Sequence, residues 1–382
     1  MNISKKRLAR SIASVGIFAL GFSGGGHAFA AAISPTDLVV FQQGDSGDAA
    51  TTAATDLNIV EVNPALTSQT TPVQTFAISS QASGALETAS AASEGSLTLS
   101  NNNTLVTFAG YVGSVATEAD EANRAAGAIN AAGVYTEGAT YTGLTTGNQT
   151  RSAFSPDGVN YYFGDKGGMY AGGGTTPVNA NNVRSIKGFG SNTYVLQASS
   201  TTTNILLSTA SPATPNGQSP VTLTGLPGLV NNNNVVDFAL LSSGAQGAGV
   251  PDTLYVTSTQ TGGTGGILKF GFNGTTWVAE GNDTSLGLTV SGITAASNGA
   301  GGANLFVTTS AAAGVLEEVT DSAGPLSTIS DSTARVIYTA PSGTDLRGVA
   351  FAPVTTPEPG TAGLLLIGGG IMALRRRRRQ PR

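Results

Sequence analysis

Asp252-Thr253-Leu254-Tyr255-Val256 is the stretch that decides the fold, because the chain repeats it in slightly altered form. Each copy starts with Asn or Asp, which favours a tight turn, and continues with β-branched or aromatic residues that suit a buried strand. The other copies are Asp37 to Phe41, Asn103 to Phe108, Asn160 to Phe163, Asn192 to Leu196 and Asn304 to Val307. Helical periodicity is almost absent between residues 31 and 356, so the pattern predicts an all-β domain.

Each repeated strand has further short apolar runs on both sides. One run precedes it, as at Val183 to Phe189, and others follow after turns, as at Gly266 to Phe270 and Trp277 to Glu280. About four strands over roughly 50 residues are typical of a β-propeller blade. The six copies predict a propeller of six four-stranded antiparallel blades, or of seven if residues 110–150 hold another.

A second repeat indicates how the ring closes. Ala153 to Gly158, with the sequence Ala-Phe-Ser-Pro-Asp-Gly, resembles the strand and turn of TolB-like and related propellers. Ala350-Phe351-Ala352-Pro353 repeats its first half, and the strand that should follow is found instead near the N-terminus, at Asp37 to Phe41. We therefore expect the first and last segments to share one blade, which leaves no free sheet edge. The alternative is that so short a motif recurs by chance.

Two stretches depart from the strand pattern. Glu118 to Gly133 is rich in alanine and contains good helix formers, so it predicts a short helix or a loop between strands. Ser83 to Ser93 has low complexity and predicts a surface loop.

The N-terminus has the three parts of a secretory signal peptide. Lys5, Lys6, Arg7 and Arg10 form a basic region, and Ile12 to Phe22 is a short apolar core. Ala28-Phe29-Ala30 then fits the small-x-small cleavage pattern, so we expect residues 1–30 to be removed.

The C-terminus has three parts as well. Pro357-Glu358-Pro359-Gly360 is followed by the apolar run Thr361 to Leu374 and by five arginines, Arg375 to Arg379. The apolar run is shorter than the ~20 residues that a spanning helix needs, and it predicts a marginal membrane helix. The arginines should remain cytoplasmic, which places everything before Pro357 across the membrane. The prolines predict an extended segment that an enzyme can reach.

These three parts, in this order at the chain end, resemble the PEP-CTERM sorting signal of Gram-negative bacteria. The resemblance implies that the membrane protease exosortase recognises Pro357, Glu358, Pro359 and Gly360, and that Arg375, Arg376, Arg377, Arg378 and Arg379 form a retention cluster. An ordinary anchor that is never cleaved is the alternative. The domains expected are a signal peptide (1–30), an exported β-propeller-like domain (31–353), a linker with the motif (354–360), a short transmembrane helix (361–374) and a basic cytoplasmic tail (375–382).

Composition narrows the chemistry of the exported part. Residues 31–356 contain eight basic and 22 acidic residues, for a net charge near −14, so a nucleic-acid partner is not expected. The chain has no cysteine, and its one histidine, His27, lies in the signal peptide. Histidine-dependent catalysis and imidazole or thiolate metal sites are thereby excluded. Paired carboxylates and oxygen-ligand calcium sites remain open.

Several polar stretches are candidate sites. Asp45-Ser46-Gly47-Asp48 and Asn282-Asp283-Thr284 lack the spacing of a defined calcium loop and favour ordinary turns. Asp120-Glu121 and Glu317-Glu318 are adjacent acids, and neighbours in a strand point to opposite faces. Trp277 and the tyrosines could form a sugar platform, but their strand positions favour the core; the tyrosines are Tyr161, Tyr162, Tyr194 and Tyr255.

The sequence therefore predicts an exported, acidic propeller that is a structural or binding protein without catalysis and without a cofactor. We expect it to pass through an inner-membrane intermediate to the cell surface or an extracellular polysaccharide matrix. Exosortase and the secretion machinery are the expected partners, with polysaccharide as a further one. A polysaccharide-acting enzyme that uses carboxylates from different blades, or a calcium-stabilised adhesin, is the alternative.

Overall fold

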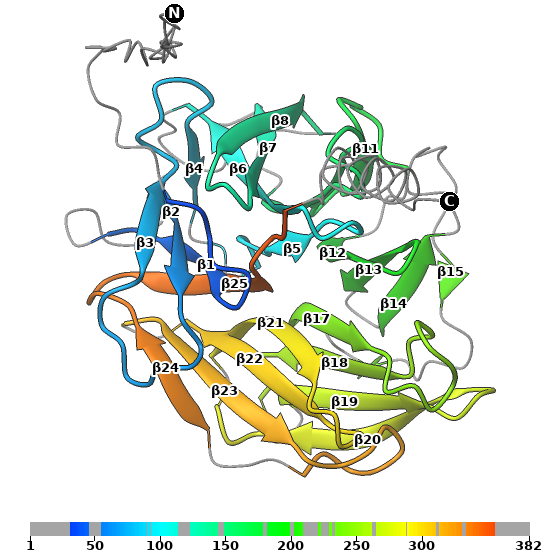
Figure 1. Cartoon of the computed structure of the whole chain (residues 1–382). Helices are drawn as coiled ribbons and strands as arrows, with labels where there is room; N and C mark the ends of the chain where they lie inside the picture. The colour runs from blue at the N-terminus through cyan, green and yellow to red at the C-terminus, as the bar shows by residue number, and fades with distance from the viewer. Residues whose placement is uncertain are drawn as a thin grey trace, which may run out of the picture.

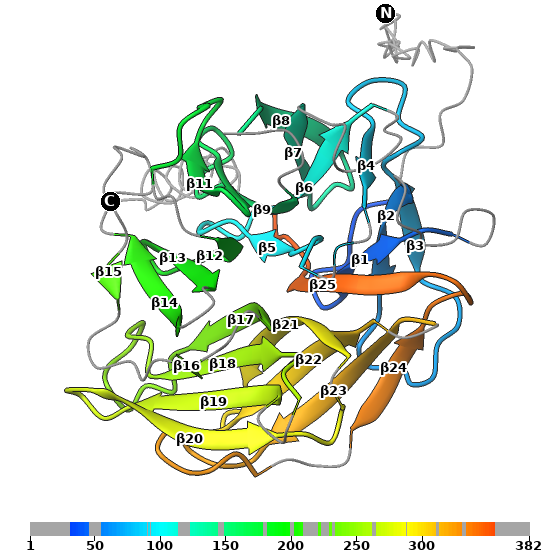
Figure 2. The same ribbon diagram turned by 180° about the vertical axis from the view of Figure 1, so that it is seen from behind.

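The computed structural model describes residues 31–355, with gaps at 46–54, 90, 92, 114–122, 144–148, 179–181, 199–201, 209–220, 223–228, 231–233, 262–264, 288, 311–312 and 331–333. Every regular element in this part of the chain is a strand, and all paired strands run antiparallel. The strands group into blades arranged around a common centre (Figures 1 and 2). The all-β, propeller-like fold predicted from the repeats is confirmed.

The first two blades belong to one continuous sheet. The closing blade consists of β25 (Asp345–Phe351), β1 (Leu38–Gln43), β2 (Thr55–Val62) and β3 (Gln74–Ala77). The next consists of β5 (Thr98–Leu99), β6 (Leu105–Val112), β7 (Arg124–Asn130) and β8 (Tyr135–Tyr141). The short strand β4 (Leu86–Thr88) pairs with both β2 and β6 and joins the two blades.

The other four blades are separate sheets. In the described residues the third has three strands and the fourth has five, which differs from the four strands predicted for each blade. The third consists of β9 (Thr150–Phe154), β10 (Tyr162–Asp165) and β11 (Gly168–Ala171). The fourth consists of β12 (Val183–Phe189), β13 (Asn192–Ala198), β14 (Thr202–Ser208), β15 (Val221–Thr222) and β16 (Leu229–Val230). The fifth is β17 (Val235–Leu241), β18 (Thr253–Ser258), β19 (Gly266–Phe272) and β20 (Trp277–Asp283). The sixth is β21 (Val290–Ser297), β22 (Ala303–Thr309), β23 (Val315–Asp321) and β24 (Arg335–Thr339).

The repeated sequence occupies the same place in each of these blades. Its six copies give β1, β6, β10, β13, β18 and β22, the second strand of each unit from the centre outward. The second strand of each blade is covered on both faces by the neighbouring blades, which explains its continuous run of large apolar residues. The number of blades in the whole chain stays a prediction, although the described ranges hold six.

The ring closes by pairing the first and last strands of the described residues. β1 and β25 are antiparallel, with Leu38 opposite Phe351, Val39 opposite Ala350 and Val40 opposite Val349. The repeat of Ala-Phe-x-Pro at residue 350 predicted this shared blade, and the strand pairing confirms it. The last blade packs on the same sheet, since Leu38, Val40 and Val349 share an apolar cluster with Phe306 and Ile337.

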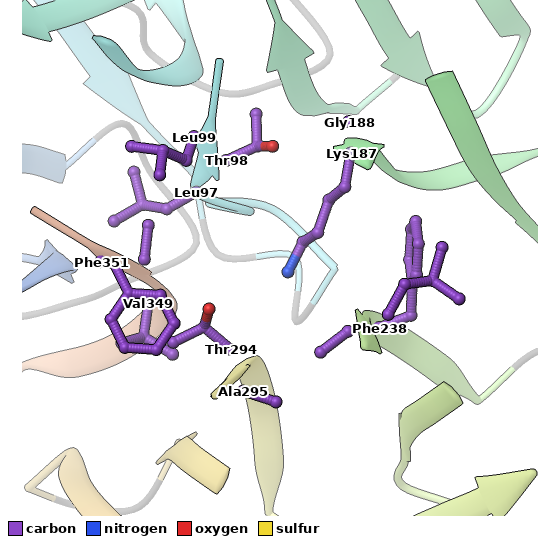
Figure 3. Close-up of a pocket in the computed structure, with 13 residues that line it drawn as sticks. Leu97, Thr98, Leu99, Lys187, Gly188, Phe238, Thr294, Ala295, Val349 and Phe351 are labelled. Atoms are coloured by element: carbon purple, nitrogen blue, oxygen red, sulfur yellow. The ribbon is translucent and has the colours of Figure 1, made fainter. Parts of the chain in front are cut away.

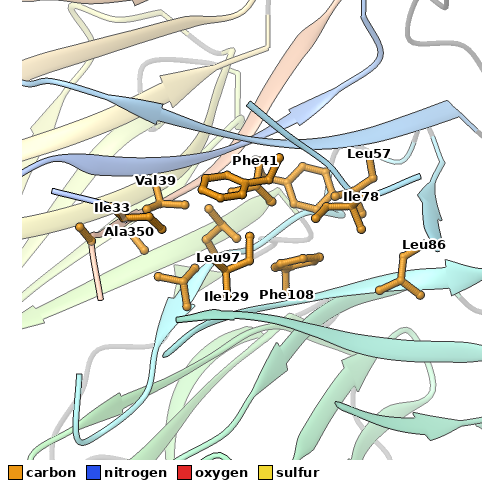
Figure 4. Packing of buried hydrophobic residues seen from close by; sticks show 14 of the residues in the cluster. Ile33, Val39, Phe41, Leu57, Ile78, Leu86, Leu97, Phe108, Ile129 and Ala350 are labelled. Carbon is orange, nitrogen blue, oxygen red and sulfur yellow. The ribbon is translucent and has the colours of Figure 1, made fainter. Parts of the chain in front are cut away.

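Apolar clusters fill the junctions between successive blades. Between the first and second, Phe41 of β1 meets Phe108 of β6 edge to face, with ring centroids 6.2 Å apart (Figure 4). Further clusters join the second to the third blade and so on around the ring to the sixth. Because each blade buries its faces against two neighbours, stability depends on an unbroken ring.

Two local predictions were wrong. The alanine-rich segment forms strand β7 between residues 124 and 130, not a helix or loop, and residues 118–122 lie outside the described part. Gly127 lies opposite Phe108, and a Cβ at Gly127 would come within 2.3 Å of the Phe108 ring. Small residues therefore make room for a neighbouring ring, and packing overrides helix propensity. Residues 83–93 are not simply a surface loop, because they contain the buried strand β4.

Candidate functional site

The first strands of the blades surround a cavity on the ring axis. Its volume is about 100 Å³, and its walls come from β12, β17, β21, β25 and the segment around β5. Most residues that line it are apolar, with Leu97, Leu99, Phe238, Val349 and Phe351 among them (Figure 3), but polar atoms face the cavity nearly as much as apolar ones do. Thr98 and Thr294 add two hydroxyl groups. Solvent reaches the cavity, since Leu99, Thr294 and Phe351 are partly exposed.

Among the described residues that line this cavity, Lys187 is the charged one. Its side chain extends from β12 toward the axis, and 13% of its surface is exposed (Figure 3). Lys187 Nζ donates to Asp237 Oδ2 at 2.8 Å and to the carbonyl oxygen of Ile293 at 2.8 Å. It also lies 5.7 Å from the centre of the Phe238 ring. Burial lowers the pKa of Lys187, and the Asp237 carboxylate opposes that shift.

Asp237 connects the cavity to a second, smaller hollow. Its Oδ2 accepts from the backbone N–H of Ile293 at 3.1 Å as well as from Lys187. The residue also lines a hollow of about 10 Å³ together with Glu94, Ser291 and Arg347. Asp237 Oδ1 is buried without a hydrogen-bond partner among the described residues. A hollow of this size holds about one water molecule, which could satisfy that oxygen.

Basic residues are concentrated on the first strands. Half of the eight between residues 31 and 356 lie there: Arg151 on β9, Arg184 and Lys187 on β12, and Arg347 on β25. Arg151 donates to the carbonyl of Val183 at 3.0 Å and also contacts Asn182. Burial, with a contribution from nearby Arg184, lowers the pKa of Arg151 to about 9. Burial also lowers the pKa values of Arg184 and Arg347.

The carboxylates nearest the axis are already engaged by other groups. Glu94 accepts from the Tyr111 hydroxyl at 2.6 Å and from the backbone N–H of Ala89 at 2.9 Å. Asp345 accepts from Arg347 at 2.8 Å. Asp237 is likewise paired to Lys187, so each of these three carboxyl groups has a hydrogen-bonding partner, and Glu94 and Asp237 line the same small hollow.

The sequence-predicted acidic stretches do not come together at this site. Glu317 and Glu318 lie on β23, the third strand of its blade, and Glu318 pairs with Arg335. Asp283 accepts from the backbone N–H of Ser285 at 2.7 Å, which is ordinary turn chemistry. Asp120-Glu121 and most of Asp45 to Asp48 lie outside the described residues. Across the described ranges, no acidic side chains cluster in a group that could hold a metal ion.

The aromatic residues considered as a sugar platform belong to the core. Tyr161, Tyr162, Tyr194, Tyr255 and Trp277 are at most 6% exposed, so they are unavailable to a ligand. The residues that line the axial cavity were not predicted. Lys187 and Asp237 are 50 residues apart in the sequence, and nothing local to either residue indicates that they meet.

The predicted processing sites lie outside the described residues. This applies to Ala28 and Ala30, to Pro357 to Gly360, and to the arginines from 375 to 379. Within the range that the structure describes, none of the elements is a helix with the length and apolarity to cross a bilayer.

Comparison with known families identifies the C-terminal segment. Residues 355–379 match the family described as the PEP-CTERM protein-sorting motif. The chain carries a PEP-CTERM sorting signal. The PEP-CTERM signal implies export, processing by exosortase, and membrane-anchored transit to the cell surface. No curated protein matches the chain.

Several solved structures resemble the chain at low identity. A putative 6-phosphogluconolactonase from Bacteroides uniformis is 10% identical, with 78% of this chain and 83% of that chain covered and a TM-score of 0.44. The periplasmic gluconolactonase of Pseudomonas aeruginosa is 10% identical, with coverage of 82% and 99% and a TM-score of 0.44. A chain of a nidogen/laminin complex is 12% identical, with coverage of 82% and 97% and a TM-score of 0.42.

Proposed function

We propose that the exported ring is a non-catalytic binding protein of the cell surface or the extracellular matrix, and that its ligand is a polysaccharide engaged at the axial cavity. The observation that carries the proposal is the cavity itself: a hollow open to solvent and lined by both apolar and polar groups, with Lys187 as the one charged side chain among the described residues that line it. Apolar walls with few polar groups are typical of ligand sites.

The state of the nearby carboxylates supports a role without catalysis. A glycosidase needs one protonated carboxyl group and one free carboxylate on either side of the bond that it cleaves. Glu94, Asp237 and Asp345 are instead bound to Tyr111, Lys187 and Arg347 respectively. None of them lines the larger cavity. An enzyme that uses acids from different blades is therefore the weaker candidate.

A titration with polysaccharides tests this proposal. We expect saturable binding without release of new reducing ends. Ala295 lines the cavity, so Ala295→Phe should fill it and reduce binding at least tenfold. Val278→Phe is the matched control, because Val278 is 39% exposed on β20, the outermost strand of its blade. Release of reducing ends that disappears in Glu94→Gln would overturn the non-catalytic role.

A further inference from the structure

The ammonium group of Lys187 has a donor to spare for a ligand. A lysine ammonium carries three N–H groups, and in the described residues two acceptors contact Nζ, namely Asp237 Oδ2 and the carbonyl of Ile293. Nζ points into the axial cavity (Figure 3). A ligand atom in the cavity that accepts a hydrogen bond from Lys187 would complete its set of partners.

The pairing of Lys187, the charged residue among the described ones that line the cavity, favours an uncharged ligand. Lys187 is neutralised by Asp237 at 2.8 Å, so the pair presents a donor and no net charge. An additional carboxylate would lose its hydration and would lie close to Asp237, which costs free energy. The exported part as a whole carries a net charge near −14 and repels acidic polymers at longer range.

The size and walls of the cavity favour a small group with an apolar part. About 100 Å³ is well below the ~300–1,000 Å³ of pockets that enclose drug-sized ligands. A small group therefore enters, and the rest of the molecule stays outside. Leu97, Phe238 and Val349 would contact an apolar part, while Thr98 and Thr294 offer hydroxyl groups to a polar neighbour.

We propose that the cavity receives the acetyl groups of a neutral, acetylated polysaccharide. The acetyl carbonyl oxygen accepts the third N–H of Lys187, and the methyl group packs against the apolar walls. The sugar chain remains outside, where Thr294 donates to it or accepts from it. This inference rests on the proposed binding function and adds the chemical class of the ligand.

Two forms of one polymer test the inference. The probes are acetylated glucomannan and the same glucomannan after mild alkali, which removes the ester-linked acetyl groups and leaves an uncharged chain. We expect the mature protein to bind the acetylated form at least tenfold more tightly. Lys187→Met should abolish this preference, because a hydrogen bond from a charged donor contributes roughly tenfold or more in affinity. Thr294→Val should weaken binding about threefold to tenfold.

Lys166→Met is the matched control, because Lys166 is exposed on the surface. Its loss should leave the affinities for acetylated and for alkali-treated glucomannan unchanged. If Lys187→Met fails to fold, the inference is still tested by the weaker binding expected of Thr294→Val and by the weaker binding expected of the alkali-treated probe. Equal binding of both probes, with Ala295→Phe abolishing both, would overturn the acetyl inference while the binding function stands. If the protein binds other polysaccharides but neither form of glucomannan, the acetyl inference is likewise overturned and the binding function stands. Absence of binding to any polysaccharide would overturn both.

Discussion

Ending the chain after Ser342, before β25 begins, is expected to leave the exported domain unfolded, whereas ending it after Thr355 is expected to leave it folded. The short chain lacks the strand that pairs with β1, so an edge of the first blade is exposed. Leu346 and Val349 are lost, and Leu38 and Val40 lose their cover. Four such side chains at about 1.5–3 kcal/mol each amount to roughly 6–12 kcal/mol. That range is comparable to the whole stability of a typical domain, about 5–15 kcal/mol.

Circular dichroism and chemical denaturation of the two shortened chains measure this effect. The chain ending after Thr355 is the control, since it lacks the same C-terminal signal and keeps β25. A cooperative transition of equal midpoint in both chains would show that the ring does not depend on its closing strand.

Lys269→Met is expected to lower the free energy of unfolding by about 3–5 kcal/mol, the usual effect of breaking one side of a buried ion pair. Lys269 Nζ lies 2.7 Å from Asp321 Oδ2, and both side chains are fully buried. The same carboxylate accepts from the Tyr255 hydroxyl at 2.8 Å. The pair joins β19 of the fifth blade to β23 of the sixth, so the variant leaves an uncompensated charge between blades.

The double variant Lys269→Met with Asp321→Asn shows how much of the lost stability comes from the uncompensated charge and how much from changed packing. It removes the uncompensated charge and should recover part of the lost stability, as measured by urea denaturation. Lys166→Met again serves as the control for losing an exposed lysine. A single variant as stable as this control would contradict a structural role for the pair.

The fold could be predicted from the sequence because its signal is repeated. Every copy of the strand at Asp252 to Val256 is the second strand of a blade and is buried on both faces. The local preference of its sequence for a buried strand therefore matches its position in the blade. The closing pair was predictable for a similar reason, since Ala350 to Pro353 repeats a motif whose remainder lies near the N-terminus. The segment around β7 was not predictable, because its alanines and Gly127 reflect the room needed by Phe108.

The candidate site could not be read from the sequence. Lys187 and Asp237 lie on neighbouring blades, and their contact depends on how closely the first strands approach the axis. The repeated sequence that predicts the fold belongs to the second strands. The residues that line the cavity lie on the first strands, whose sequences vary from blade to blade. The motif at residues 355–379 that was visible in the sequence concerns sorting and not ligand binding, and the N-terminal signal peptide stays a prediction.

The intact mass of the native protein tests most directly whether the working molecule is the exported ring alone. Removal of the signal peptide after Ala30 and cleavage between Pro357 and Gly360 predict a mass close to that of residues 31–357 to 31–360, plus any group attached on processing. A protein that still ends at Arg382 would contradict this processing and would leave the ring held in the membrane by an uncleaved tail.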